Sequence, residues 1–197
     1  LELMKLVHIP DPEAVLRKYP HQLSGGMRQR VMIAMAIACN PQLLFADEPT
    51  TALDVTIQAQ ILDILDSIRQ RYGMAMILIT HDMGVIASRT NRVAVMYAGK
   101  KVEEASTKSL FTSMHHPYTQ SLLAAVPKLS GSRERIRLAS IPGNPPDLTR
   151  LDGGCRFAPR CSNVQADCRA SEPVLAGDSQ HIFACFHPVD GPRTATS

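Results

Sequence analysis

Short apolar runs alternate with longer amphipathic ones in the first half of the chain. Residues 43–46 and 75–80 are apolar over the length of a strand, as expected of strands buried in a parallel sheet. The intervening residues 55–72 carry apolar side chains at helical spacing, between a capping Asp54 and a terminating Gly73. These apolar positions are Ile57, Ile61, Ile64, Leu65 and Ile68. Strand, helix and strand in this order imply a right-handed parallel crossover and hence an α/β fold.

A further helix is predicted over residues 26–39, with Ser24 as its N-cap. Residues 32–38 are apolar on every side, so we expect this helix to be deeply buried. Cys39, at its end, is expected to be one more buried apolar side chain.

Other stretches predict shorter elements. Residues 1–7 have the spacing of the end of a helix, and residues 11–19 form a short helix because Asp is a good N-cap and Pro is favoured in the first turn. Residues 93–97 and 101–104 predict the two strands of a hairpin.

The region after the hairpin begins with two adjacent histidines, His115 and His116, before a helix predicted to end at residue 126. Neighbouring residues do not share a helix face, so a capping and packing role is favoured over a metal site. Residues 127–150 are rich in proline, glycine and arginine and are predicted to form a linker. Without an aromatic platform nearby, its arginines favour a solvated face over nucleic-acid binding. They include Arg133, Arg135 and Arg137.

Length, charge and hydropathy limit the class of protein. The 197 residues suffice for one domain with a small appendage. A net charge of +3 is too mild to indicate nucleic acid as a partner. No apolar run approaches the roughly 18 residues that span a bilayer, and no signal peptide is apparent.

The chemistry that the pattern brings together is a phosphate–metal site. The Ser-Gly-Gly turn at 24–26 exposes backbone N–H groups at a helix N-terminus, which favours an anion. Asp47 and Glu48 follow the first strand, at the sheet edge where α/β folds bind ligands. The crossover should bring His81, after the second strand, to the same edge. Taken singly, each feature has a simpler explanation as a capped turn, a solvated carboxylate pair or a loop histidine.

Four motifs in this order resemble those of the ATP-binding cassette (ABC) ATPases. LSGGMRQR at 23–30 is similar to the family's signature motif, and LLFADEP at 43–49 to its Walker B strand. TTALD at 50–54 resembles the D-loop, and ILITHD at 77–82 resembles the strand with the switch histidine. The residues of these motifs are most similar to those of the bacterial dipeptide and oligopeptide importer branch. The segment HPYT at 116–119 also resembles this branch.

The resemblance implies a partial P-loop-type cassette. The family's G-x-x-x-x-G-K-[ST] loop occurs nowhere in these residues, so we expect the C-terminal part of a cassette. Residues 1–105 are predicted to be that part, and 106–150 a helix and linker. Residues 151–188 would form a cysteine-rich module and 189–197 a tail.

The resemblance also implies roles for the motif residues. Asp47 would hold Mg²⁺, Glu48 would polarise the attacking water as the catalytic base, and His81 would reach the γ-phosphate or orient that water. Asp54 would contact a second cassette as well as cap its own helix. The ATP of the second cassette would meet Ser24, Gly25, Gly26 and Met27, the last replacing the family's usual glutamine.

Four cysteines fall together in the C-terminal region with the spacing C-x5-C-x6-C-x16-C: Cys155, Cys161, Cys168 and Cys185. A reducing cytosol disfavours disulfides, and the close C-x2–4-C pairs typical of structural zinc are absent. Irregular spacing suits an iron–sulfur cluster, whose negative charge Arg156, Arg160 and Arg169 would offset. The resemblance to peptide-importer ATPases implies a [4Fe–4S] cluster. Zinc, with His181 or His187 replacing a ligand, and plain thiols remain alternatives.

The implied function is ATP hydrolysis that energises peptide import at the cytoplasmic face of a bacterial inner membrane. The implied partners are a second ATPase subunit, two transmembrane permease subunits and, indirectly, a periplasmic substrate-binding protein. One alternative is a non-catalytic, truncated regulatory or partner-binding remnant, which the absent P-loop favours. Another is a DNA-repair ATPase, although the coiled-coil heptads of that class are absent.

Overall fold

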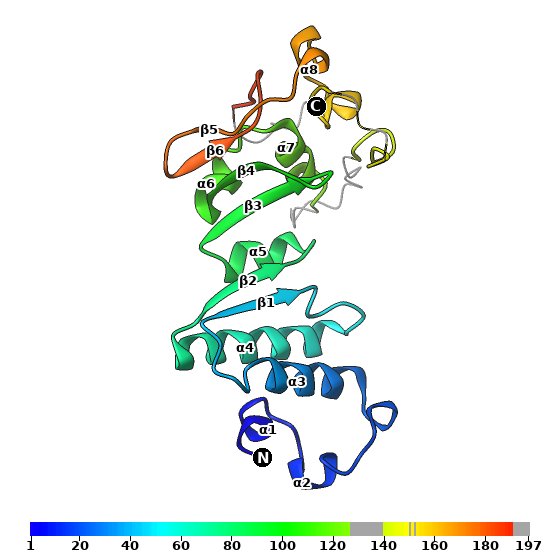
Figure 1. Cartoon of the computed structure of the whole chain (residues 1–197), viewed down its shortest axis with the longest axis vertical. Coiled ribbons are helices and arrows are strands. Elements are labelled where there is room, and N and C mark those ends of the chain that lie inside the picture. The colour runs from blue at the N-terminus through cyan, green and yellow to red at the C-terminus, as the bar shows by residue number, and fades with distance from the viewer. Residues whose placement is uncertain (127–139, 150, 152, 191–197) are drawn as a thin grey trace, which may run out of the picture. The chain divides into compact units, whose positions relative to one another are not determined.

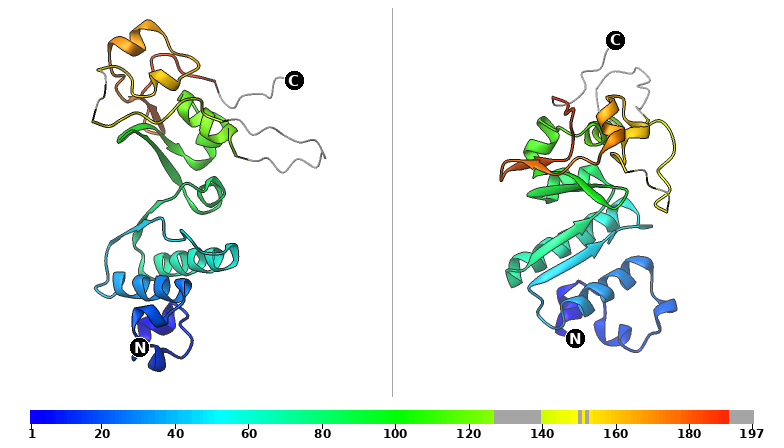
Figure 2. Two further views of the ribbon diagram at one scale, coloured as in Figure 1. Left: turned by 90° about the vertical axis from the view of Figure 1, so that its right-hand side faces the viewer. Right: turned by 45° about the horizontal axis from the view of Figure 1, so that its top comes forward.

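The computed structural model describes residues 1–126, 140–149, 151 and 153–190. The chain forms two compact units, Leu1–His81 and Asp82–Ser197. The first runs from blue to cyan-green in Figures 1 and 2, and the second from green to red. Each has its own sheet. The division lies upstream of the boundary predicted after residue 105, because the predicted hairpin shares a sheet with a strand of the cysteine-rich region.

The first unit is built on the predicted strand–helix–strand sequence. Its elements are α1 (Glu2–Leu6), α2 (Pro12–Val15), a 3₁₀ turn (Pro20–Gln22), α3 (Gly25–Ala36), β1 (Leu43–Asp47), α4 (Val55–Tyr72) and β2 (Ala75–Ile79). Strands β1 and β2 pair in parallel, from Leu43 opposite Ala75 to Asp47 opposite Ile79. The predicted helix over 55–72 is confirmed, with Gly73 in the left-handed conformation at its C-terminus (φ 61°).

The core of the first unit lies on one side of this strand pair. Figure 1 shows α4 next to β1 and β2, and α3 beyond α4. The predicted apolar face of α4 is confirmed, since it buries Ile61, Ile64, Leu65 and Ile68. Leu44 and Ala46 of β1 join the same cluster.

Burial all round α3 is not observed. Ile33 and Ile37 are buried, but Met32 is 60% exposed and Met35 70% exposed. Within this unit α3 packs against α1 and α4, which leave these two methionines exposed. The helix ends before Cys39, which is exposed, so the predicted burial of this cysteine is wrong.

The two strands are likewise buried on alternate positions only. Leu44 is buried, whereas its neighbour Phe45 is 63% exposed and Ile77 on β2 is 44% exposed. The prediction of fully buried strands is therefore wrong for this unit, because its helices cover only one face of the pair. The predicted helix over 11–19 is also shorter, since α2 ends at Val15.

The second unit holds an antiparallel sheet in the order β3-β4-β6-β5. Its elements are α5 (Met83–Arg89), β3 (Arg92–Tyr97), β4 (Lys100–Ser106), α6 (Thr107–Thr112), α7 (Pro117–Ala124), a 3₁₀ turn (Ala158–Arg160), α8 (Ala166–Ala170), β5 (Ala176–Gly177) and β6 (His181–Phe183). The predicted hairpin is confirmed as β3 and β4, which turn through Ala98 and Gly99 at positive φ.

A buried carboxylate joins β4 to two other elements of this unit. Glu103 is fully buried and accepts hydrogen bonds from the amides of His115 (2.6 Å) and His116 (3.1 Å). His181 Nε2 on β6 lies 2.7 Å from the same carboxylate. His116 Nδ1 accepts a hydrogen bond from the Tyr118 amide at the start of α7, so the predicted capping role is confirmed for His116.

Among the residues that the structure describes, no helix is long and apolar enough to cross a membrane. Most of the predicted linker, including Arg133, Arg135 and Arg137, lies outside the described residues, as does most of the predicted tail.

Candidate nucleotide and metal sites

The Ser-Gly-Gly turn begins α3 and leaves backbone donors at its N-terminus. Ser24 Oγ accepts a hydrogen bond from the Met27 amide (3.3 Å), as an N-cap does. For the described part of the chain, no hydrogen bond is recorded from the amides of Gly25 and Gly26. Because these amides lie at the positive end of a helix dipole, an anion can bind there.

Gly26 is also required by packing. A Cβ atom at this position would lie 2.8 Å from Ile57 Cγ2 on α4, closer than side-chain carbons approach. At Gly25 the corresponding contact, with Leu53 Cδ2, is 3.3 Å. The glycine pair thus lets the start of α3 lie directly against the start of α4, which is a structural reason for Gly26 that spacing did not reveal.

The two arginines of the same motif make structural hydrogen bonds. Arg28 Nε donates to the Leu23 carbonyl (3.0 Å). Arg30 donates to the Val7 carbonyl (2.8 Å) and to Gln60 Oε1 (2.8 Å). Arg30 therefore links α1, α3 and α4, a role that the sequence did not indicate.

The predicted catalytic residues meet at the carboxyl end of the strand pair. Asp47 ends β1 opposite Ile79, the last residue of β2, and is exposed. Glu48 follows it, and its amide donates to the Ile79 carbonyl (2.9 Å). Glu48 Oε1 lies 3.1 Å from His81 Nδ1. The crossover thus places the histidine beside the carboxylate, as the strand order predicted.

Hydrogen bonds hold the Glu48 carboxylate in its charged form. Thr51 Oγ1 donates to Glu48 Oε2 (2.7 Å), and this bond, followed by the one from His81, lowers the pKa of Glu48 below its usual value. The side chains remain open to solvent, with 46% of Glu48 and 81% of His81 exposed. The pair therefore presents a carboxylate, oriented by two neighbours, to whatever binds at this edge.

Asp54 has the capping role predicted for it. Its Oδ1 accepts a hydrogen bond from the Ile57 amide (2.9 Å) at the first turn of α4. A capped helix start explains this aspartate within one chain.

In the second unit, four cysteines line a single small cavity: Cys155, Cys161, Cys168 and Cys185. The Cys155 amide donates to the Cys168 carbonyl (2.8 Å), which joins the segment before the 3₁₀ turn to α8. Gly154 makes this approach possible, because a Cβ there would lie 2.7 Å from the same carbonyl oxygen. The fold therefore gathers thiols that are up to thirty residues apart in the sequence, counting from residue 155 to residue 185.

The thiols influence one another's ionisation. Burial, with a smaller contribution from the nearby Cys161, Cys155 and Cys168, raises the pKa of Cys185 to about 11. Burial likewise raises the pKa of Cys155, with a contribution from Cys168. Thiols in such surroundings stay protonated unless a cation binds among them.

A mixed set of metal ligands lies at the edge of this cavity. Asp167, Cys168 and His187 offer ligand atoms that all lie within 4.8 Å of one another. His187 Nε2 is 2.8 Å from both carboxylate oxygens of Asp167. Among the described residues, this is the one set of three so close together, and it contains a single thiol.

Comparison with known proteins gives two family matches. The family described as "ABC transporter" matches residues 1–51, and "Oligopeptide/dipeptide transporter, C-terminal region" matches residues 102–168. The oligopeptide transport ATP-binding protein OppD of Salmonella typhimurium is 46% identical over 190 residues, 96% of this chain and 56% of OppD. The dipeptide transport ATP-binding protein DppD of Escherichia coli K12 is 50% identical over 192 residues, 96% of this chain and 58% of DppD. Over nearly its whole length the chain is thus similar to the ATP-binding proteins of peptide ABC transporters.

A further relative shows a comparable identity. The probable peptide ABC transporter ATP-binding protein y4tR of Sinorhizobium fredii is 52% identical over 187 residues, which are 94% of this chain and 56% of that protein. The chain thus spans about half the length of the curated relatives it matches. A solved ATP-binding cassette, MJ0796 bound to ADP and phosphate, is 33% identical with a TM-score of 0.47, covering 54% of this chain and 44% of that one.

Proposed function

We propose that this chain is part of an ATPase subunit that hydrolyses ATP to drive import of di- or oligopeptides. The observation that supports it best is the contact between Glu48 and His81 at the carboxyl end of a parallel strand pair. A carboxylate that a histidine orients can position the attacking water of phosphoryl transfer. Relatives named as peptide and dipeptide transport proteins support the peptide class.

The residues take distinct roles in this proposal. Glu48, kept charged by Thr51 and His81, accepts a proton from water or orients it. Asp47, exposed at the same strand end, holds Mg²⁺, which would neutralise charge on the phosphates. His81 orients Glu48 and reaches towards the γ-phosphate.

The ATP bound to the second cassette is proposed to contact the N-terminus of α3. Gly25 and Gly26 would contribute their amides, Ser24 its hydroxyl, and Met27 the next position of the turn. Asp54, while capping α4, would meet the second cassette. Two cassettes would then act on two membrane permease subunits at the cytoplasmic face of a bacterial inner membrane, served by a periplasmic binding protein.

Peptide uptake in proteoliposomes tests this function. The subunit, assembled with its permease partners, should lose ATP-driven uptake in Glu48→Gln while still binding ATP, because only the water-positioning carboxylate is removed. Glu13→Gln, at an exposed carboxylate on α2, is the matched control and should transport normally. Full uptake by Glu48→Gln would contradict the role of Glu48.

The four thiols suit a [4Fe–4S] cluster better than a closed zinc site. Four thiolates around one zinc ion would lie about 3.8 Å apart, given Zn–S bonds of about 2.3 Å. The described thiols supply no set of three within 4.8 Å. Four thiols around a common cavity can supply the four ligands of a polynuclear cluster, which would link Cys155 and Cys185 to the other two thiols and rigidify the module. The cavity that these thiols help to line has a volume of only about 10 Å³, so the side chains would have to move outwards to admit a cluster.

Metal and sulfide analysis of anaerobically purified protein tests the cluster. We expect about four irons and four sulfides per chain, lost in Cys185→Ser. Cys39→Ser is the matched control, since Cys39 is an exposed thiol in the other unit. About one zinc without iron would instead favour the Asp167–Cys168–His187 set as the metal site.

The alternatives have less support. A partner-binding chain without catalysis would retain the signature turn but gain nothing from the Glu48–His81 contact. A DNA-repair ATPase does not account for the peptide-transporter match over residues 102–168.

A further inference from the structure

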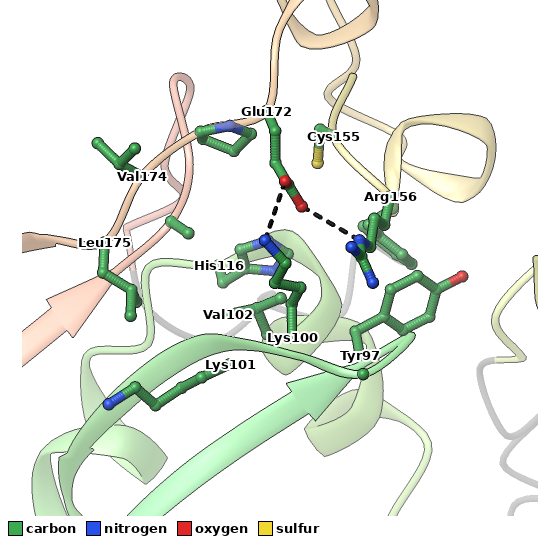
Figure 3. A pocket seen from close by; sticks show the side chains of 14 residues that line it. Tyr97, Lys100, Lys101, Val102, His116, Cys155, Arg156, Glu172, Val174 and Leu175 are labelled. Carbon is green, nitrogen blue, oxygen red and sulfur yellow. Dashed lines mark hydrogen bonds and ion pairs between the residues drawn. The ribbon is translucent and has the colours of Figure 1, made fainter. Parts of the chain in front are cut away.

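A pocket of about 440 Å³ opens in the second unit, between the β3–β4 turn and the segment that leads into β5 (Figure 3). This volume lies in the range of small-molecule sites. Most of its wall is apolar, from side chains of the hairpin, of the segment before β5, and of residues next to the 3₁₀ turn and to β6. They are Val102, Phe157, Val174, Leu175 and Ala184.

One side of the pocket carries charge. Glu172 accepts hydrogen bonds from Lys100 Nζ (3.1 Å) and from Arg156 Nε (3.1 Å). Lys101 also lines the pocket, but its ammonium points away in Figure 3 and pairs with Glu104 (2.6 Å). Two cations and one carboxylate therefore face the cavity, and their net charge of +1 favours a ligand with one negative charge.

Both cations keep donors for such a ligand. Within the described part of the chain, Arg156 uses Nε on Glu172 and Nη1 on the Ala98 carbonyl, and no hydrogen bond is recorded from Nη2. The Lys100 ammonium has three N–H groups and one recorded partner. The side chains of Lys100 and Glu172 are 52% and 37% exposed, so an incoming carboxylate can reach them and compete with Glu172.

The opposite side of the pocket offers both apolar surface and backbone. Val174 is 79% exposed and Leu175 40% exposed, and Figure 3 shows both across the pocket from Arg156. For these two residues the structure records no backbone hydrogen bond from the N–H groups to any described residue. A backbone segment with unused donors next to an apolar wall suits a peptide, which supplies carbonyl acceptors as well as apolar side chains.

We propose that this pocket binds a short apolar peptide by its free C-terminal carboxylate. The carboxylate displaces Glu172 from Lys100 and Arg156, and the terminal apolar side chain packs against Val174 and Leu175. Glu172 is then an internal competitor that occupies the anion site when no peptide is present. Neither ATP nor a metal enters this inference, so its failure would leave the proposed function standing.

Calorimetric titration of the full chain with N-acetyl-Leu-Leu tests the proposal. A ligand of this size should bind with a Kd on the order of 0.1 mM. Its C-terminal amide, which lacks the carboxylate, should bind at least about fivefold more weakly. Lys100→Met should weaken binding of the acid by about three- to fivefold, whereas Glu172→Gln should tighten it by a similar factor.

Matched variants and ligands make the outcome decisive. Lys108→Met removes an exposed charge of the same unit away from the pocket and should leave binding unchanged. Melting temperatures of all variants show that they are folded. Equal binding of acid and amide, or weaker binding by Glu172→Gln, would overturn the carboxylate site. Octanoate binding as tightly as the peptide acid would overturn the assignment to peptides.

Discussion

Glu48 adopts a backbone conformation that non-glycine residues seldom use, with φ 42°. Its amide bonds to the Ile79 carbonyl, and its carboxylate to Thr51 and His81, so three contacts hold the residue in place. Backbone strain of this kind persists only where the surroundings fix it, and it concentrates at functional sites. The conformation therefore supports a site at Glu48 independently of the motif that contains it.

His116 should make the stability of the chain depend on pH. Burial lowers the pKa of His116 from 6.5 to about 4, which outweighs the attraction of Glu103. Because the folded pKa is depressed below the unfolded value, the neutral ring favours folding above pH 6.5, and this contribution is lost as pH falls towards 4. Between pH 7 and pH 5 the wild type should lose about 2 kcal/mol from this group, measured by urea unfolding.

An asparagine at this position provides the control for His116. Asn can still accept a hydrogen bond from the Tyr118 amide as an N-cap but does not titrate. His116→Asn should be less stable than the wild type at pH 7, because a large buried ring is lost, yet should show a smaller decline between pH 7 and pH 5. An unchanged decline would mean that other groups cause it.

At the scale of elements, α3 and α4 touch where both begin. Gly26→Ala should lower the free energy of unfolding by about 1–3 kcal/mol, because the added methyl group meets Ile57 at 2.8 Å and the helices must separate. Gly25→Ala is the matched control, with the same gain in helix propensity and a looser 3.3 Å contact. Urea midpoints compare the two, and equal midpoints would show that the helix pair adapts freely.

Asp54 caps α4 and is also proposed to contact a second cassette, and unfolding measurements can test the first role alone. Asp54→Ala removes the acceptor for the Ile57 amide and should cost about 1 kcal/mol of stability, whereas Asp54→Asn keeps a good cap and should change it by only a few tenths. Unfolding measured on the chain alone isolates this effect from any contact with a second cassette. A stable Asp54→Ala variant would refute the importance of the cap.

At the scale of the whole molecule, the 197 residues should show negligible ATP hydrolysis on their own. The phosphate-cradling loop and its lysine, which phosphoryl transfer needs, are not among these residues. Phosphate release by the purified chain measures this. Steady turnover that Glu48→Gln abolishes would show that these residues build a complete site.

The sequence by itself determined the features that depend on residues close together in the chain. Periodicity and end signals predicted α4 from Val55 to Tyr72, the cap at Asp54 and the hairpin of β3 and β4, because each depends on neighbours in the chain. The strand–helix–strand order also predicted that His81 would approach Glu48, since parallel strands bring their carboxyl ends to one edge.

Only the tertiary structure decided contacts that depend on distant segments. It showed that Met35 is exposed on α3, that Glu103 is buried against His181, and that Glu172 joins Lys100 and Arg156. An apolar pattern indicates that a face can be buried but not which element covers it, and a charged residue's burial depends on partners up to about eighty positions away, as between residues 103 and 181. Interactions between neighbours in the chain therefore determined the helices and strands. Contacts between segments far apart in the sequence determined the thiol cavity and the pocket.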